Sequence, residues 1–289
     1  MLAIRRFPHN PIIRPGMDPT GRMGSNINGP SLIQAPDWLP GRLGRYYLYF
    51  GDHHGTYIRL AYADQLAGPW TIYSPGTLQL DQTSCRDHLA SPDVHVDHAR
   101  RQIRMYYHGP VNVREQKSFV ALSSDGIHFK SRAGELGLSY FRVFQWGGWH
   151  YALAMPGVFY RSPDGLSGFE QGPTLFSPNM RHSALQLQGN RLWVYYTNAG
   201  DCPESILRVS IDLTSDWLSW QTSPPEVVLQ PETDYEGGHL PLEPSQRGFI
   251  DVPVRQLRDP CVYEEDGRTY LLYAVAGESG LAIAEIVEV

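Results

Sequence analysis

Short apolar runs alternate with turns along the whole chain, and one pattern recurs five times. Each copy holds an apolar run, a turn with Gly or a charged residue, an aromatic strand and a second alternating strand. The aromatic strands are Tyr46–Tyr49, Met105–Tyr107, Trp149–Tyr151, Trp193–Tyr196 and Tyr270–Tyr273. A unit of roughly 45–60 residues with about four short strands has the size of a propeller blade. The pattern therefore predicts an all-β fold, a five-bladed β-propeller.

The repeats predict that residues 1–289 form a single propeller domain. The predicted blades cover about 26–73, 91–129, 140–169, 182–220 and 258–289. A long irregular connection, 221–256, separates the last two, and we expect it to wall a pocket because such long connections are uncommon unless they serve a site. The fifth blade has no closing aromatic, so we expect segment 1–25 to supply its outer strand and remove an exposed edge.

Composition and charge exclude several classes of function. The net charge is −6 and basic residues are scattered, which argues against a nucleic-acid partner. No run reaches transmembrane length, and the first residues lack the apolar core of a signal peptide. The three cysteines, Cys85, Cys202 and Cys261, are far apart and show no CxxC spacing, so neither a disulfide framework nor a thiolate zinc site is expected. We expect a cytoplasmic protein without a membrane partner, and the oligomeric state stays open.

Polar or charged residues begin the inner strand of every predicted blade. These starts are Asn28-Gly29-Pro30, Ser91-Pro92-Asp93, Tyr140-Phe141-Arg142, Arg181-His182-Ser183 and Arg258-Asp259-Pro260. Because inner strands line the axis of a propeller, the five starts should meet around one cavity. The 17 Tyr and 7 Trp residues add flat apolar faces of the kind on which sugar rings stack. A small carbohydrate is the expected partner.

Glycoside hydrolysis needs two carboxyl groups, one to protonate the leaving oxygen and one to activate water or attack directly. Asp93 and Asp259 are the carboxylates at the inner-strand starts, and crowding of acids in a poorly hydrated funnel separates their pKa values. Glu204 and Glu236, in the connections, are further candidates for the acid. Each of these residues alone is equally consistent with turn capping or a solvated charge.

Five residues are candidates for substrate binding, and they are Asn28, Tyr140, Arg142, His182 and Arg258. An arginine there would bind an anionic substrate group or pair with an axial Asp, which would keep that Asp ionised. His182 suits a proton donor, a hydroxyl-binding group or a structural residue. No histidines have the i, i+4 spacing of a helical zinc pair, so no catalytic metal and no required cofactor are expected. A structural cation held by oxygen atoms stays open.

Three segments make the chain resemble the five-bladed propeller glycosidases of glycoside hydrolase family 43 and its relatives. They are Ser91-Pro92-Asp93-Val94, Ala63–Trp70, and Arg258-Asp259-Pro260 leading into Glu265–Tyr273. The resemblance implies a general-base Asp in blade one, a pKa-tuning Asp in blade two and a general-acid Glu in blade three. Asp93 matches the second. The first falls on Asn28-Gly29-Pro30 and the third near Ser139-Tyr140-Phe141, where there is no carboxylate.

Three functions remain open from the sequence. The first is an exo-acting glycoside hydrolase on a small oligosaccharide, with Asp93 and Asp259 at its centre. The second is a glycoside phosphorylase, in which Arg142, Arg181, His182 and Arg258 would clamp phosphate. The third is a sugar-binding propeller without catalysis, which the missing carboxylates favour.

Overall fold

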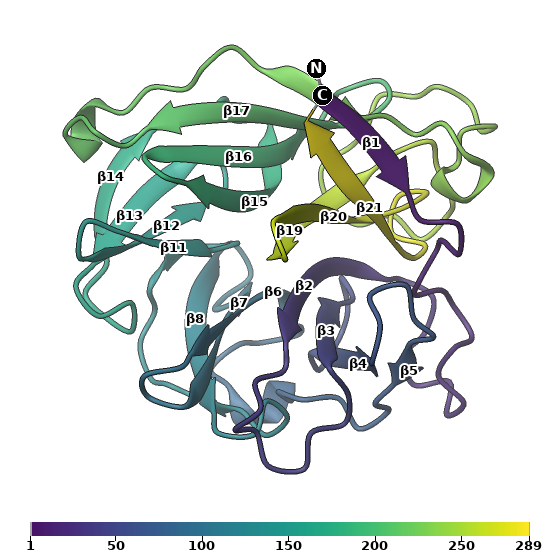
Figure 1. The fold of residues 1–289 in the computed structure, drawn as a ribbon, viewed down its shortest axis with the longest axis horizontal. Coiled ribbons are helices and arrows are strands. Elements are labelled where there is room, and N and C mark those ends of the chain that lie inside the picture. The colour runs from purple at the N-terminus through teal and green to yellow at the C-terminus, as the bar shows by residue number, and fades with distance from the viewer. Residues whose placement is uncertain (1, 289) are drawn as a thin grey trace.

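The computed structural model describes residues 2–288; residues 1 and 289, the limits of the predicted domain, lie outside the described part. Five antiparallel sheets stand around one axis like the blades of a propeller (Figure 1). The predicted fold class, an all-β five-bladed propeller, is confirmed. No described helix is long and apolar enough to cross a membrane.

Blades I, III and IV each hold four strands in sequence order, blade II holds five, and blade V takes its fourth strand from the N-terminal segment. Blade I holds β2 (Asn28–Gln34), β3 (Tyr46–Gly51), β4 (Arg59–Ala63) and β5 (Thr71–Ile72). Blade II holds β6 (Ala90–Asp97), β7 (Gln102–Pro110), β8 (Gln116–Ser123) and the short β9 (Lys130–Ser131) and β10 (Gly137–Leu138), both paired with β8. Blade III holds β11 (Arg142–Trp146), β12 (Trp149–Ala154), β13 (Val158–Ser162) and β14 (Glu170–Thr174).

Blade IV holds β15 (Met180–Gln188), β16 (Arg191–Asn198), β17 (Ile206–Asp212) and β18 (Glu226–Leu229). Blade V holds β19 (Arg258–Glu265), β20 (Arg268–Ala274), β21 (Leu281–Glu288) and β1 (Leu2–Arg6). Three 3₁₀ turns, η1 (Leu80–Gln82), η2 (Trp217–Ser219) and η3 (Asp234–Glu236), lie in the connections.

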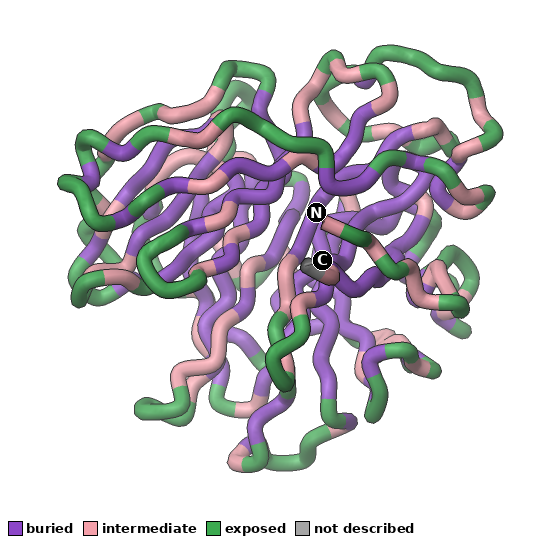
Figure 2. The backbone as a smooth tube through the Cα atoms, turned by 45° about the horizontal axis from the view of Figure 1, so that its top comes forward, coloured by how far each residue is buried: buried purple, intermediate pink, exposed green. Residues whose placement is uncertain are grey.

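The five aromatic segments of the repeat all lie in the second strands, β3, β7, β12, β16 and β20. Tyr49, Tyr195 and Tyr273 on these strands are fully buried between neighbouring sheets. Large aromatic side chains suit this place because they bury much apolar area and keep one polar atom for a hydrogen bond. Figure 2 shows the result, with buried backbone in the strands and exposed backbone in the outer loops.

The N-terminal strand closes the ring, as the sequence predicted. β1 pairs antiparallel with β21, with Ile4 opposite Ile286 and Arg6 opposite Ala284. The two ends of the chain therefore lie side by side in blade V (Figure 1). The connection 221–256 differs from expectation in one respect, because β18 lies within it. Val228 and Leu229 of that strand are buried, and this apolar packing completes blade IV.

One residue at each inner-strand start has a left-handed backbone. The five are Gly29 (φ 57°), Ser91 (47°), Tyr140 (69°), His182 (50°) and Asp259 (48°). In blades I, II, IV and V the pairing of inner and second strands shifts register at this point. Non-glycine residues rarely adopt this conformation, and such strain concentrates at functional sites. The alignment of five such positions identifies one end of the axis as the candidate site.

Candidate functional site

A cavity of about 310 Å³ opens at this end of the axis. We call it the histidine cavity. Its lining comes from every blade and from the long connection, and it consists of Asn28, His53, His88, Ala90, Ser91, His108, Gln116, Ser139, Tyr140, Met155, Arg181, His182, Arg247, Gly248 and Asp259. The inner-strand starts therefore meet around one cavity. Arg247 and Gly248 belong to segment 221–256, which helps to wall it.

Asp259 is the only carboxyl group among the described residues that line this cavity. It is 2% exposed, and its Oδ1 accepts a hydrogen bond of 2.8 Å from the hydroxyl of Tyr140. The Nε2 of His182 lies 3.9 Å from the same oxygen. Burial, with the negative charge of Glu278 nearby, raises the pKa of Asp259 to about 6. Asp259 can therefore hold a proton near neutral pH and release it to a bound molecule.

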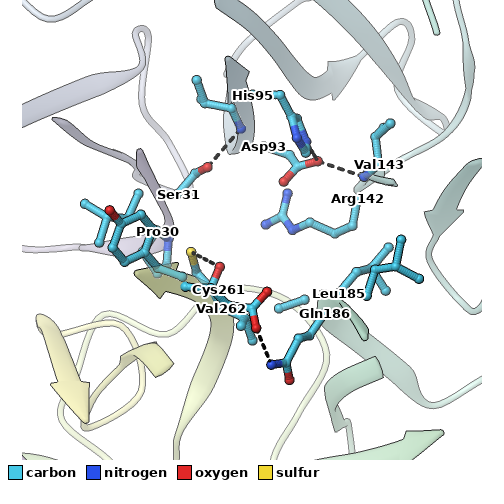
Figure 3. A pocket seen from close by; sticks show the side chains of 16 residues that line it. Pro30, Ser31, Asp93, His95, Arg142, Val143, Leu185, Gln186, Cys261 and Val262 are labelled. Carbon is cyan, nitrogen blue, oxygen red and sulfur yellow. Dashed lines mark hydrogen bonds and ion pairs between the residues drawn. The ribbon is translucent and has the colours of Figure 1, made fainter. Parts of the chain in front are cut away.

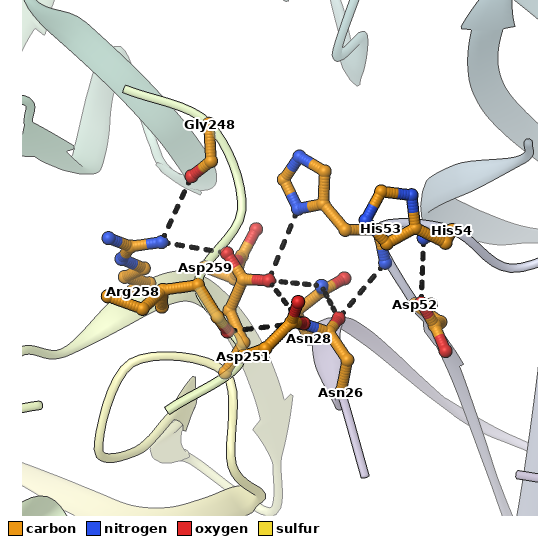
Figure 4. A network of polar contacts seen from close by, with 12 residues as sticks. Asn26, Asn28, Asp52, His53, His54, Gly248, Asp251, Arg258 and Asp259 are labelled. Atoms are coloured by element: carbon orange, nitrogen blue, oxygen red, sulfur yellow. Dashed lines mark hydrogen bonds and ion pairs between the residues drawn. The ribbon is translucent and has the colours of Figure 1, made fainter. Parts of the chain in front are cut away.

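Glu278 belongs to the polar network drawn in Figure 4, in which Arg258, Asn28 and Asp259 are labelled. Its Oε1 accepts a 2.7 Å bond from Arg258, and its Oε2 is shared by Asn26, Asn28 and His53. Burial alone would raise the pKa of Glu278, but these partners outweigh it and hold the pKa at about 2. The two acids thus differ sharply: Glu278 is a fixed anion, whereas Asp259 titrates.

Arg258 and Arg181, each one residue before a left-handed position, share a second buried acid. Oε1 of Glu204 accepts a hydrogen bond of 2.9 Å from Arg181 Nε, and Oε2 of Glu204 lies 3.2 Å from Arg258 Nε. All three side chains are at most 2% exposed. Two predictions are corrected here. Glu204 does not line the cavity, so it is not placed to act there as an acid. Arg258 is not free to bind substrate, because it forms a buried ion pair with Glu204 that connects blades IV and V.

Four imidazoles line the cavity, from His53, His88, His108 and His182. Burial lowers the pKa of His108 and His182 well below the usual value, and the neighbouring arginines add to the effect. Burial also lowers the pKa of His88. For His53 the hydrogen bond to Glu278 outweighs burial and raises the pKa. At neutral pH three of the rings are therefore neutral and can accept a proton.

Arg142 lies below the cavity and not in it. Its Nε donates to Ser183 O at 2.9 Å and its Nη1 to Ser91 O at 3.0 Å, while the guanidinium stacks on Tyr140, 4.1 Å from the ring centre. The prediction that Arg142 binds substrate in this cavity is thus corrected. Backbone carbonyls of blades II and IV hold the guanidinium across the axis, beneath the cavity. We call this guanidinium the Arg142 plug.

Asp93 lies on the far side of this plug. It lines a separate cavity of about 280 Å³ with His95, Arg142 and residues farther along the inner strands (Figure 3). Its Oδ2 accepts bonds from the backbone of Val143 at 2.8 Å and from His95 Nε2 at 2.7 Å. Burial would raise the pKa of Asp93, but His95 and Arg142 lower it. We call this space the Asp93 cavity; the predicted pairing of Asp93 with Asp259 at one site is not what the structure shows.

Glu236 lies far from both cavities, in the outer part of blade V. Arg6 Nε donates to it at 2.8 Å and the hydroxyl of Tyr273 at 2.9 Å, and the side chain is fully buried. Burial raises the pKa of Glu236, but Arg6 outweighs this and lowers it. Glu236 fastens β1 to the propeller, so the prediction that it is a catalytic acid is corrected.

The remaining candidates do meet in the histidine cavity. Asn28, Tyr140 and His182 line it together with Asp259. No group of three or more His, Cys, Asp or Glu side chains within residues 2–288 is placed to hold a metal ion.

Gly29 occupies the position where the resemblance to family 43 places a general-base Asp. A Cβ atom there would stand 2.9 Å from the Cα of Ser91, and the backbone is left-handed. The corresponding starts of blades II and III carry Ser91 and Tyr140. The equivalent start of blade V is Asp259-Pro260, which carries a carboxylate where blades I and II have Gly29-Pro30 and Ser91-Pro92.

No known protein family model matches the chain. One curated protein, the uncharacterised protein R118 of Acanthamoeba polyphaga mimivirus, is 39% identical over 99% of this chain and 90% of its own length. The two proteins belong to one family. The fold supplies a wider comparison.

Solved structures of glycoside hydrolases share the fold of the protein described here. A family GH43 β-xylosidase/α-arabinofuranosidase from a compost microbial metagenome matches 99% of the chain and 95% of its own, at 12% identity and a TM-score of 0.64. An α-L-arabinofuranosidase from Lactobacillus brevis matches 96% and 92%, at 11% identity and a TM-score of 0.61. The resemblance to family 43 propellers predicted from three sequence motifs thus holds at the level of the fold.

Several residues of the site were not predicted from sequence. His53, His88 and His108 come from a loop, a connection and a second strand, and their spacing follows no motif. Glu278, in the Gly277–Gly280 turn after β20, stands in the sequence only as one of several acids in the connections, and nothing local ranks it above the others. No motif marks these residues, because the fold alone brings their segments together.

Proposed function

We propose that the protein is a glycoside hydrolase that uses Asp259 as its general acid. The observation that carries the proposal is the position of this one protonatable carboxyl, buried at the wall of an axial cavity. The rest of the lining consists mostly of hydroxyl, amide and imidazole groups. Such groups exchange hydrogen bonds with sugar hydroxyls, and a buried acid with a pKa near 6 donates a proton to a glycosidic oxygen.

The surroundings of Asp259 favour donation. Tyr140 keeps its own proton, because burial and the Asp259 charge raise the pKa of its hydroxyl well above 10. It donates to one carboxyl oxygen and leaves the other for the leaving group. The fixed charge of Glu278 disfavours the ionised form of Asp259 and thereby keeps the proton available.

The proposed substrate is the end of a short, neutral oligosaccharide. The cavity, about 310 Å³, lies near the lower limit of ligand pockets, which is about 300 Å³, and the Arg142 plug lies beneath it. A closed, narrow space accommodates a terminal sugar better than the middle of a polymer. Arg181 is neutralised by Glu204, so little free positive charge is available for an anionic sugar.

Phosphorolysis is less well supported. Of the four groups expected to clamp phosphate, Arg181 and Arg258 are paired with Glu204, and Arg142 is bound to backbone carbonyls. His182 is neutral because burial lowers its pKa. Arg247, exposed at the rim, is the remaining cation of the cavity.

The test is sugar release from arabino-, xylo-, galacto-, fructo- and anhydrosugar oligosaccharides, with and without phosphate. Wild type is compared with Asp259→Asn and with Asp93→Asn, a matched control at the other end of the same axis. We expect phosphate-independent release that Asp259→Asn lowers by about 10²–10⁴-fold, while Asp93→Asn stays within about 3-fold of wild type.

Other outcomes have definite meanings. Release that requires phosphate would identify a phosphorylase. Binding of sugars by the folded wild type without any release would identify a non-catalytic propeller. An equal loss in both variants would place the chemistry elsewhere and refute the role of Asp259.

A further inference from the structure

The proposed hydrolysis requires a second group, one that takes a proton from water or attacks the sugar. Asp259 is the only described carboxyl that lines the histidine cavity. Glu278 has both oxygens occupied by Arg258, Asn26, Asn28 and His53, and it does not line the cavity. A carboxylate nucleophile or base is therefore missing at this site, and the question is which side chain replaces it.

We propose that His88, oriented by Asp87, is the general base that activates water. This inference rests on the proposed hydrolase function and adds a catalytic residue to it. His88 comes from the connection before β6 and lines the same cavity as Asp259. Its Nδ1 lies 3.2 Å from Oδ2 of Asp87. A carboxylate accepts but cannot donate, so Nδ1 carries the proton and Nε2 keeps its lone pair.

The geometry of this pair is specific. Asp87 has a left-handed backbone, φ 73°, although it is not a glycine. Its side chain is 77% exposed, whereas that of His88 is 10% exposed. The strained turn thus keeps a solvated carboxylate against a buried ring. Within residues 2–288, no protein group hydrogen-bonds Nε2 of His88, so this nitrogen is free for a water molecule or a sugar hydroxyl.

The other three imidazoles are less suited to this role. His53 Nδ1 is bound to Glu278, and this raises the pKa of the ring toward the protonated form. His182 Nε2 lies 3.9 Å from the acid itself, and a base must act from the opposite side of the sugar ring. His108 has no carboxylate partner, and its Nδ1 is buried without a hydrogen bond.

The charges that face His88 keep it neutral. Burial lowers its pKa, His53 and His54 lower it further, and Asp87 opposes them; His108 is neutral. A neutral imidazole in the cavity that Asp259 also lines provides a base and an acid in the same pH range. The rate should therefore rise with pH as His88 loses its proton and fall above about 6 as Asp259 loses its own.

The step balances as a single displacement. His88 Nε2 takes a proton from water as the water oxygen bonds to the anomeric carbon. The glycosidic C–O bond breaks on the opposite face, and the Asp259 proton passes to the leaving oxygen. Solvent then takes the proton from His88 and reprotonates Asp259. One displacement inverts the anomeric configuration of the released sugar.

The experiment compares His88→Ala with His98→Ala, an exposed histidine of the turn between β6 and β7 that does not line the cavity, on a substrate that wild type cleaves. We expect His88→Ala to lower kcat by about 10²–10⁴-fold with KM within about 3-fold, and to remove the acidic limb of the pH profile. Added imidazole should restore part of the rate of His88→Ala and none to Asp259→Asn. Asp87→Asn should lower kcat less, by about 10-fold. Proton NMR of the first product should show the inverted anomer.

Two results would overturn the assignment while leaving the hydrolase intact. One is equal activity in His88→Ala and His98→Ala. The other is a product with retained configuration, which would implicate a covalent nucleophile such as Tyr140. If wild type itself released no sugar, the proposed function would fail, and the role of His88 with it.

Discussion

The two ends of the propeller axis carry an aspartate each, in surroundings that act on it in opposite ways. Asp259, with Glu278 behind it and a neutral histidine beside it, has a raised pKa of about 6. Asp93, bonded to His95 and the backbone of Val143, has a lowered pKa. The Asp259 side chain is also the more deeply buried, at 3% exposed against 16% for Asp93, and it faces an acid, whereas Asp93 faces His95 and Arg142. The same residue type becomes an acid at one end of the axis and a structural anion at the other.

The position of each aspartate relative to the left-handed residue explains the contrast. Asp259 is itself that residue, so its side chain enters the histidine cavity. Asp93 comes two residues after the equivalent Ser91, and two residues of strand advance the chain by about 6–7 Å. That advance passes the level of Arg142 and places the carboxylate in the Asp93 cavity.

The largest expected loss of unfolding free energy comes from substitution of Glu204, the buried acid near the histidine cavity. Glu204→Gln would leave Arg181 and Arg258 without their shared anion, and breaking a buried ion pair from one side costs about 3–5 kcal/mol of unfolding free energy. Urea unfolding followed by tryptophan fluorescence measures it. The control is His95→Gln at the other end, described below. Equal losses in the two variants would contradict the asymmetry.

The same substitution at the two aspartates should change stability in opposite directions. Because the pKa of Asp259 is raised in the folded protein, its contribution to the free energy of unfolding is fully present below about pH 4. That contribution is lost as the pH rises through about 6. Asp259→Asn should therefore stabilise the protein at pH 8, by up to about 3 kcal/mol, with little change at pH 4. Thermal unfolding at the two pH values measures this.

Asp93→Asn should destabilise the protein at neutral pH, the reverse of the effect expected for Asp259→Asn. Its lowered pKa means that the carboxylate stabilises the fold above about pH 4, and that this contribution is lost as pH falls. We expect a loss of about 1–2 kcal/mol at pH 7 that shrinks on acidification. A stabilised Asp93→Asn protein at neutral pH would show that the two ends do not differ as described.

Gly29→Ala tests the left-handed positions themselves. The added Cβ would meet Ser91 Cα at 2.9 Å in a backbone with φ 57°, so we expect a loss of about 1–3 kcal/mol. Gly41→Ala is the control, since it has φ 63° but no atom within 4 Å of the added Cβ. The difference between the two melting temperatures isolates the contact between blades I and II.

The smallest effect is expected from His95→Gln. The His95 side chain is 39% exposed, and exposed pairs contribute about 1 kcal/mol or less. The bond from the Val143 backbone would still hold Asp93. Chemical denaturation should show a change within that limit.

The repeat pattern predicted the fold well because each blade needs the same local features. Aromatic second strands and polar strand starts follow from burial and from the axis, and both are visible in the sequence. The site was predicted only in part. Four residues at the strand starts do line one cavity, namely Asn28, Tyr140, His182 and Asp259. Asp93 also belongs to a strand start, but it comes two residues after the left-handed Ser91 and lines the other cavity.

The remaining errors have a physical cause. Glu204 and Glu236 are acids whose partners, Arg181 and Arg6, lie 23 and 230 residues away. No local pattern distinguishes a buried paired glutamate from a catalytic one, because the distinction depends on which arginine the fold brings to it. His88 was similarly hidden, since His53 and Asp259, which line the same cavity, come from other blades.

The pairing of β1 with β21 affects how the molecule reaches its folded state. β1 is synthesised long before its partner strand, β21, so it stays unpaired until that strand has been made. Until then blade V lacks its outer strand and Glu236 lacks Arg6. Contacts between such distant segments form late and slowly. The propeller should therefore complete its ring only after β21 has formed, as one of the last steps of folding.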